Sequence, residues 1–281
     1  MFSMLTYTME LCGPILTSKE THFWDAVALQ HRNFSLPDYF KFFPKPNCLD
    51  ASPNHLSIPL VPYILGQSMP ITVRPAVKLI AVLREPIARE LSLYNHERAN
   101  GYDWWVAPGI CSASGSETFE QFANCQLASY RTLNVSIAQY DDAQRVLFRE
   151  FLYGIWKGLY VPHLDAWRRS FSRRQLYVMS YDTLSTPEEM ATNLAKFLGL
   201  YPLERKVWLP ARNTQKRERR EYTKQYTITC AIRDDLQAVF EPWNDRLYRT
   251  LRVDQQLALA PEHEPPFPEF GLHPCDDARL S

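Results

Sequence analysis

Arg84, Ser92 and His96 supply a guanidinium, a hydroxyl and an imidazole, three groups that can contact a bound ligand. A guanidinium matches phosphate with two parallel hydrogen bonds, and a hydroxyl adds another donor. Arg84 directly follows the nearly continuous apolar run of residues 78–83, which is typical of a strand buried in a parallel sheet. Because such sheets bind ligands at the carboxyl ends of their strands, the sequence predicts that Arg84 lies at a ligand-binding edge.

A helix is expected to carry the other two side chains. Pro86 favours a helix start, because proline at the first helical position has no N–H to lose, and Asn100-Gly101 favours the helix end. At 100° per residue, Ser92 and His96 lie on the face opposite to the apolar one. The same pattern is also typical of an ordinary strand–helix unit whose polar face is solvated.

A carboxylate and an imidazole near the start of the chain form a second candidate site. If residues 18–25 are extended, the period of two places Glu20 and His22 on one side. A carboxylate can accept a proton from a hydroxyl or an amine when burial raises its pKa. A charged surface loop would have the same composition, so both interpretations stay open.

The length of the chain is enough for one large α/β domain, and its balanced charge gives the protein no strong overall electrostatic field. The chain has 281 residues, with 31 Lys and Arg against 31 Asp and Glu, so its charge does not point to nucleic acid or to a membrane surface. No apolar run approaches 18 residues, and residues 1–16 contain no Lys or Arg, so neither a membrane span nor a signal peptide is expected. The six cysteines have no metal-ligand spacing and leave the redox compartment open.

Further elements follow from local patterns. A second buried strand is expected over residues 175–180, and a helix should begin after Thr186 and end at Gly199. A basic cluster occupies residues 216–224, which in isolation is typical of a solvated face. Other helices are expected over residues 4–11, 58–65, 117–127 and 141–153.

The segment LREPIARELSLYNH, residues 83–96, resembles the 3′-phosphate-binding segment of sulfotransferases that use 3′-phosphoadenosine 5′-phosphosulfate (PAPS). The resemblance is strongest to Golgi carbohydrate enzymes, including heparan sulfate N- and 3-O-sulfotransferases. It implies that Arg84 and Ser92 bind the 3′-phosphate of PAPS. His96 matches a histidine that is proposed to assist catalysis in the N-sulfotransferases.

Four further segments resemble the same family in the same order. KETHFWD, residues 19–25, is similar to the segment with the catalytic base, which implies that Glu20 is the base and that His22 and Asp25 line the acceptor site. Residues 50–55 resemble the pattern Glu-Lys-Ser/Thr-Pro-x-Tyr, although Ala51 stands where several heparan sulfate enzymes have a lysine. The other two similar segments are residues 158–167 and residues 240–248.

A nucleotide-binding loop is placed by counting back from the last of these segments. The family has a basic loop about 20 residues before its last helix, and this implies that Arg220 and Lys224 contact the phosphates of the nucleotide. The glycine-rich loop that holds the phosphosulfate group has no counterpart before residue 4, so the sulfotransferase domain, residues 1–255, is expected to be truncated at that loop. Residues 256–281 are expected to be a Pro-rich, disordered tail, in which residues 268–271 could pack back.

The resemblance implies an α/β, P-loop-NTPase-like three-layer sandwich whose central parallel sheet lacks its first strand. The implied function is transfer of a sulfonate group from PAPS to a hydroxyl or an amine, on a glycan or another acceptor, in the Golgi lumen. It implies no metal, no nucleic-acid partner and no membrane segment in this chain. The alternative is an inactive protein of the same fold that binds glycan or nucleotide. A P-loop kinase would need a Walker lysine and a magnesium-binding carboxylate, and the sequence has neither motif.

Overall fold

The computed structural model of the protein describes nine stretches of the chain: residues 12, 20–30, 34–45, 48–100, 111, 118–133, 154–200, 228–253 and 267–276. The chain forms two compact units. Unit 1 comprises Met1–Leu83, His163–Arg212 and Leu251–Pro268, and unit 2 comprises Arg84–Pro162, Asn213–Thr250 and Glu269–Ser281.

A parallel pair of strands forms the centre of unit 1. Strand β1 (Leu79–Leu83) pairs with β2 (Leu176–Ser180), in register from Leu79 opposite Leu176 to Leu83 opposite Ser180. All of β2 is buried, whereas β1 alternates between partly and fully buried residues. Both strands lie within one residue of the predicted ranges. The predicted α/β class with a parallel sheet flanked by helices is therefore confirmed.

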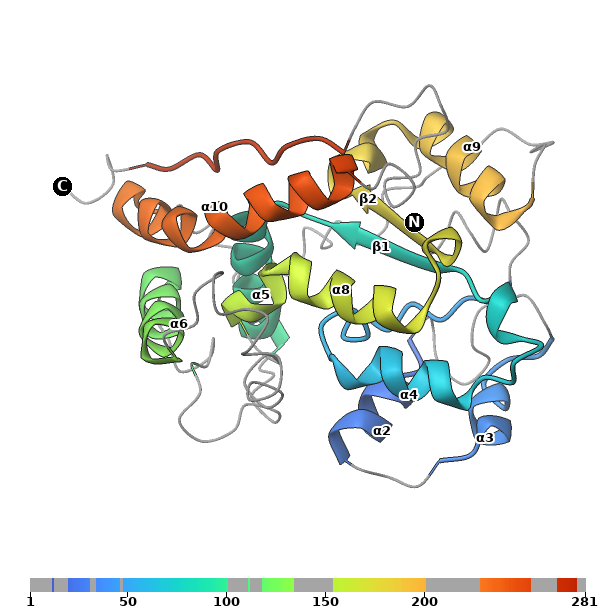
Figure 1. Ribbon diagram of the computed structural model, residues 1–281. Helices are drawn as coiled ribbons and strands as arrows, with labels where there is room; N and C mark the ends of the chain where they lie inside the picture. Colours follow the sequence, from blue (N-terminus) through green and yellow to red (C-terminus); the bar gives the residue numbers. More distant parts are fainter. Residues whose placement is uncertain are drawn as a thin grey trace. The chain divides into compact units, whose positions relative to one another are not determined.

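Helix α9 (Pro187–Leu198) covers one face of this sheet. Tyr177 and Met179 of β2 pack against Met190, Leu194 and Phe197 of the helix, and the rings of Tyr177 and Phe197 are stacked 5.4 Å apart. In Figure 1 the two strands run between α8 (Tyr160–Ser170) and α9.

The C-terminal end of α9 has the predicted geometry, whereas its N-terminal end lacks the predicted cap hydrogen bond. Gly199 has φ 72°, and its N–H donates to the carbonyls of Ala195 and Lys196, as expected for a left-handed glycine at a helix end. Thr186 precedes the helix as predicted. Its hydroxyl, however, donates to the carbonyl of Thr183 instead of accepting from the first turn, so the expected threonine cap is wrong in its chemistry.

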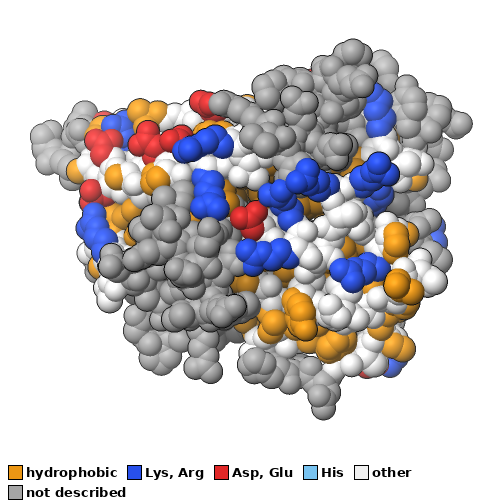
Figure 2. All heavy atoms as spheres, viewed as in Figure 1, with side chains coloured by type: hydrophobic (Ala, Val, Ile, Leu, Met, Phe, Trp, Pro, Cys, Tyr) orange, Lys and Arg blue, Asp and Glu red, His pale blue; other side chains and the backbone are white. Residues whose placement is uncertain are grey.

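Short helices build the remainder of unit 1. Phe23 and Trp24 of α2 pack against Tyr39 of α3, with ring centroids 5.3 and 4.9 Å apart. Figure 2 shows hydrophobic side chains gathered over α4, where Tyr63 is exposed. The elements are α2 (Phe23–Gln30), α3 (Leu36–Phe40), α4 (Leu60–Ser68), η1 (Arg74–Ala76), η4 (Arg173–Gln175) and η5 (Tyr181–Ser185).

The described part of unit 2 contains four helical elements: α5 (Pro86–Asn100), α6 (Phe119–Leu133), η3 (Gly154–Gly158) and α10 (Cys230–Val253), the last of which ends in unit 1. Ile87 and Tyr94 of α5 are fully buried, while Ser92 and His96 are exposed, so the predicted faces of this helix are confirmed. Tyr94 contacts Phe119 and Phe122 of α6, with ring centroids 5.7 and 5.5 Å apart.

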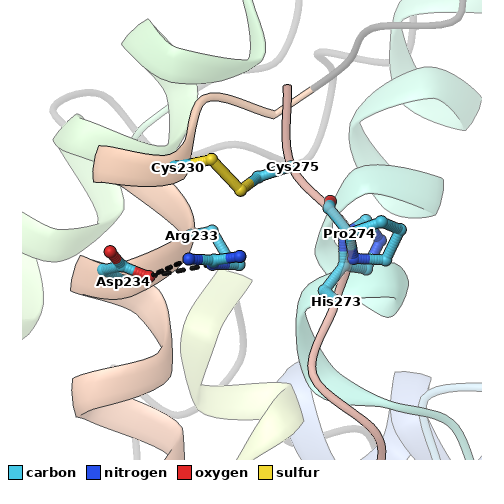
Figure 3. Close-up of a disulfide and its surroundings, with 6 residues drawn as sticks. All are labelled: Cys230, Arg233, Asp234, His273, Pro274 and Cys275. Atoms are coloured by element: carbon cyan, nitrogen blue, oxygen red, sulfur yellow. Dashed lines mark hydrogen bonds and ion pairs between the residues drawn. A yellow bond between two sulfur atoms is a disulfide. The ribbon is translucent and has the colours of Figure 1, made fainter. Parts of the chain in front are cut away.

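A disulfide between Cys230 and Cys275 holds the last described segment of unit 2 against the start of α10 (Figure 3). The N–H of Phe270 donates to the Tyr248 hydroxyl at 2.7 Å, and the N–H of Asp276 donates to the Ile228 carbonyl at 3.1 Å. The segment is therefore attached to α10 and the residues before it by one disulfide and two hydrogen bonds. The packing expected for residues 268–271 agrees with the Phe270 contact.

Two more disulfides, Cys12–Cys48 in unit 1 and Cys111–Cys125 in unit 2, use the remaining cysteines. The helices expected over residues 4–11 and 141–153 lie outside the described residues, as do Arg220 and Lys224. In the part of the chain that the structure describes, no helix is long and apolar enough to cross a membrane.

Candidate functional site

In unit 1, the structure brings Glu20, His22 and Asp25 together around one imidazole. His22 Nε2 lies 3.1 Å from Glu20 Oε2, and His22 Nδ1 lies 2.8 Å from Asp25 Oδ2. Glu20 and His22 are partly exposed, whereas Asp25 is only 4% exposed. The imidazole therefore connects a buried carboxylate to one that solvent can reach.

The local backbone is not the extended segment that would place Glu20 and His22 on one side by strand alternation. His22 has φ 51°, in the left-handed region that residues other than glycine rarely adopt, and α2 begins at the next residue. The His22 carbonyl accepts the N–H of Ala26, and Asp25 lies in the first turn of the helix. The turn at His22, and not strand alternation, brings its side chain to Glu20. Backbone strain of this kind is concentrated at functional sites.

Asp50 holds this turn in place. Its carboxylate accepts the hydroxyls of Thr21 at 2.6 Å, Ser52 at 2.7 Å and Tyr39 at 3.2 Å. The Ser52 hydroxyl in turn accepts the backbone N–H of His22 at 2.9 Å. The sequence analysis did not single out Asp50. The signal that was available is an aspartate two residues before a serine, since Asp50 also accepts the N–H of Ser52, as in an Asx turn.

His55 is a second imidazole of the cluster that the sequence analysis missed. Its Nε2 lies 3.8 Å from Asp25 Oδ1, on the side of Asp25 opposite to His22. Burial lowers the pKa of His55, although the charges of Asp50 and Asp25 act in the other direction. The neutral form of His55 is therefore favoured by its burial.

The pKa of His22 moves the other way. Partial burial would lower it, but the hydrogen bond and charge of Asp25 and those of Glu20 together outweigh burial and raise the pKa of His22. The imidazolium form of His22 is thus favoured between its two carboxylates. Such a group can hold a proton next to a reacting base.

In unit 2, Arg84 follows β1 and is partly exposed, and Ser92 and His96 are exposed on one face of α5. The Tyr160 hydroxyl donates to the Arg84 carbonyl at 2.6 Å and so fixes the backbone where the strand ends. The three side chains therefore lie on two successive elements, at the end of β1 and on the exposed face of α5.

The N-terminus of α5 is not open to a phosphate group. The Glu85 carboxylate accepts the N–H groups of Ile87 and Ala88 at 2.8 and 2.6 Å, so it takes donors that would otherwise bind an anion. Burial raises the pKa of Glu85, against the opposing effect of these two N–H donors. The N–H groups of Ile87 and Ala88 are therefore already occupied by Glu85.

A cavity of about 130 Å³ in unit 2 is also unsuited to a nucleotide phosphate. Four carboxylates lie along it, and like charges at close range repel a phosphate. The residues that line it are Glu85, Gln237, Glu241, Asn244, Asp245, Tyr248, Glu269, Phe270 and Gly271.

Among the described residues, no group of three or more His, Cys, Asp or Glu side chains could hold a metal ion.

The fold and the unit 1 cluster define an α/β protein with a carboxylate–imidazole site suited to proton transfer. The family model described as "Sulfotransferase domain" matches residues 14–229, and the chain therefore belongs to the sulfotransferase domain family. The predicted membership of the PAPS sulfotransferase family is therefore confirmed. The P-loop-like α/β sandwich expected from that membership is confirmed as well.

The chain is also similar to one curated protein in sequence and to one solved structure in fold. It is 27% identical to mouse carbohydrate sulfotransferase 15 over 201 residues, which is 68% of this chain and 32% of the relative, so the chain spans about a third of the length of that relative. A sulfotransferase from Alicyclobacillus acidocaldarius has a similar structure, with a TM-score of 0.52 and 16% identity. That match covers 89% of this chain and 90% of the bacterial one, and at this identity it shows the fold alone.

Proposed function

We propose that this protein transfers a sulfonate group from PAPS to a hydroxyl or an amine of a carbohydrate acceptor. Membership of the sulfotransferase domain family supports the reaction type, and the similarity to an enzyme named carbohydrate sulfotransferase 15 supports the acceptor class. The observation that carries the proposal is the Glu20–His22–Asp25 cluster. It provides a solvent-accessible carboxylate held next to an imidazole whose pKa is raised.

In this reaction Glu20 accepts the proton of the acceptor group. As the acceptor oxygen or nitrogen forms its bond to sulfur, the bond from sulfur to the phosphate oxygen of PAPS breaks, and that oxygen keeps the electron pair. The His22 imidazolium stabilises the Glu20 carboxylate before the transfer, because its Nε2 lies 3.1 Å from Oε2. Asp25 orients the imidazole through Nδ1, and His22 and Asp25 also line the acceptor side of the site.

Arg84 and Ser92 bind the 3′-phosphate of the nucleotide in this proposal, together with Arg220 and Lys224 from outside the described residues. Their chemistry fits an anion, since a guanidinium and a hydroxyl donate hydrogen bonds to phosphate. Because Glu85 takes the first N–H groups of α5, these side chains carry the binding. His96, exposed one turn after Ser92, donates to the bridging oxygen as it becomes the leaving group.

A secretory compartment, the Golgi lumen, is the proposed location. All six cysteines form disulfides, and disulfides persist in oxidising compartments and are rare in the cytosol. The similarity to a carbohydrate sulfotransferase supports the same location.

The test is transfer of ³⁵S from labelled PAPS to a panel of desulfated glycosaminoglycan chains by the wild-type protein and by Glu20→Gln. Removing a general base typically costs about 10²–10⁴-fold in rate. The matched control is Glu188→Gln, which changes an exposed glutamate of α9 in the same unit and should leave transfer unchanged. Equal transfer by wild type and Glu20→Gln would overturn the assignment of the base.

The second candidate function is binding of glycan or nucleotide without turnover. Ala51 favours it, because a methyl group stands where several heparan sulfate enzymes have a lysine near the transferred sulfonate. Under this alternative the wild-type protein binds adenosine 3′,5′-bisphosphate but transfers no label. The transfer assay combined with a binding titration separates the two functions.

A further inference from the structure

Two buried polar atoms in unit 1 face each other without hydrogen bonds. Asp25 Oδ1 and His55 Nε2 are both shielded from solvent, and neither has a hydrogen-bond partner among the described residues. They lie 3.8 Å apart, which is longer than a hydrogen bond. The other oxygen of Asp25 is engaged by His22 Nδ1 at 2.8 Å and by Asn54 Nδ2 at 3.4 Å.

We propose that His55 is a positioning residue that acts through Asp25 to hold His22 against Glu20. A neutral imidazole with its hydrogen on Nε2 can donate to Asp25 Oδ1 after a shift of less than 1 Å, and this single bond satisfies both buried atoms. The carboxylate of Asp25 is then held at both oxygens and cannot rotate. This inference rests on the proposed function only in naming Glu20 as the group that the arrangement serves.

The surroundings of His55 support a neutral donor. The charged or titratable groups that act on it are Asp50 and Asp25, which favour its protonation, and His22, which opposes it. Burial outweighs the two carboxylates and lowers the pKa of His55. An uncharged His55 leaves the negative charge of Asp25 available to His22, whereas a protonated one would compete with His22 for the same carboxylate.

The expected consequence of losing His55 is a looser His22. The hydrogen bond and charge of Asp25 are the largest effects that raise the pKa of His22, ahead of those of Glu20. When Asp25 can rotate, these effects weaken, and the pKa of His22 falls back toward its usual value. Because pairing with an opposite charge favours the charged form of a group, partial loss of the Asp25 pairing should lower the His22 pKa.

The experiment is an NMR titration of the histidine ring protons in wild type, His55→Phe and His55→Gln. His22→Gln identifies the His22 signal, and His273→Gln in unit 2 serves as the control that leaves it unchanged. We expect His55→Phe to lower the His22 pKa and His55→Gln to retain it, because the glutamine amide can donate from nearly the same place as Nε2. An unchanged His22 pKa in folded His55→Phe overturns the proposal.

A second measurement needs no substitution and covers the case in which His55→Phe does not fold. Nitrogen-15 shifts of the wild-type imidazoles report which ring nitrogen carries the hydrogen. We expect the Nε2–H form for His55, and the Nδ1–H form overturns the proposal. Neither measurement uses PAPS or an acceptor. A failure here therefore concerns His55 alone, whereas a failure of the transfer assay concerns the proposed function.

Discussion

The candidate residues of the two units are held in different ways. In unit 1, His22 contacts both Glu20 and Asp25, and Asp50 accepts hydrogen bonds from the hydroxyls of Thr21 and Ser52 beside this turn. In unit 2, Arg84 and Ser92 are placed by the end of a strand and the face of a helix. An acid–base group depends on close neighbours, because they set its pKa. A group that binds an anion depends chiefly on its position, because its charge or its donors need no adjustment.

Asp50→Ala should produce the largest effect and tests whether the unit 1 turn depends on side-chain contacts. The change leaves the hydroxyls of Thr21, Ser52 and Tyr39 without their acceptor, and unsatisfied donors of this kind cost about 1–3 kcal/mol each. We expect a loss of roughly 3–4 kcal/mol in the free energy of unfolding. Urea denaturation measures it, with Asp182→Ala in exposed η5 as the control. Equal stability of Asp50→Ala and Asp182→Ala would mean that the unit 1 turn does not depend on the contacts of Asp50.

Replacing Cys230 and Cys275 together by alanine should have the next largest effect, in unit 2. A disulfide that closes a loop of 45 residues stabilises a protein by about 2–4 kcal/mol. At roughly 2–4 °C per kcal/mol, the melting temperature should fall by about 4–16 °C. Differential scanning calorimetry without reductant keeps the other two disulfides intact. An unchanged melting temperature would mean that the contacts of Phe270 and Asp276 alone hold the segment on α10.

Arg84→Ala should weaken nucleotide binding, because its guanidinium is the group proposed to bind the 3′-phosphate. Hydrogen bonds to a charged group are worth about 1.5–3 kcal/mol, which corresponds to roughly a tenfold to hundredfold loss of affinity. Calorimetric titration of adenosine 3′,5′-bisphosphate measures it without an acceptor. Arg131→Ala, an exposed arginine of α6 in the same unit, is the control. Wild-type affinity in Arg84→Ala would contradict the predicted phosphate site.

The smallest expected effect is a pH dependence carried by His22. Because its folded-state pKa is raised, its contribution to stability is fully present below the unfolded value of about 6.5 and is lost as pH rises through the folded value. His22→Gln should therefore lower the melting temperature more at pH 6 than at pH 8.5. Melting curves at both pH values check the sign. A larger loss at pH 8.5 would mean that the charge of His22 is not stabilised by its carboxylates.

Local patterns were enough to predict strand β1, the start of α5 and the end of α9. The apolar run of β1, the proline that begins α5 and the glycine that ends α9 each act over a few residues, so the sequence carries them directly. The faces of α5 also followed from helical periodicity alone. The family match over residues 14–229 agrees with the resemblance drawn from ordered motifs.

The parts that could not be predicted depend on contacts between residues far apart in the chain. Asp50 meets Thr21, and His55 faces Asp25, across about 30 residues, and no periodicity reports such pairs. The disulfide pairing could not be predicted either, because six cysteines allow fifteen connectivities. Residues 256–281 were expected to be a disordered tail in which only residues 268–271 could pack back, because the tail is rich in Pro, His and Asp. A covalent bond to Cys230 overrides that composition.

The bridge between Cys230 and Cys275 also affects how the chain responds to proteolysis. A single cut of the backbone at any bond between the two cysteines separates the polypeptide into two pieces that stay covalently joined. Such a nicked protein migrates as one band on a gel without reductant and divides into two bands after reduction. Apparent resistance to a protease is therefore meaningful for this protein only when the gel is run in both conditions.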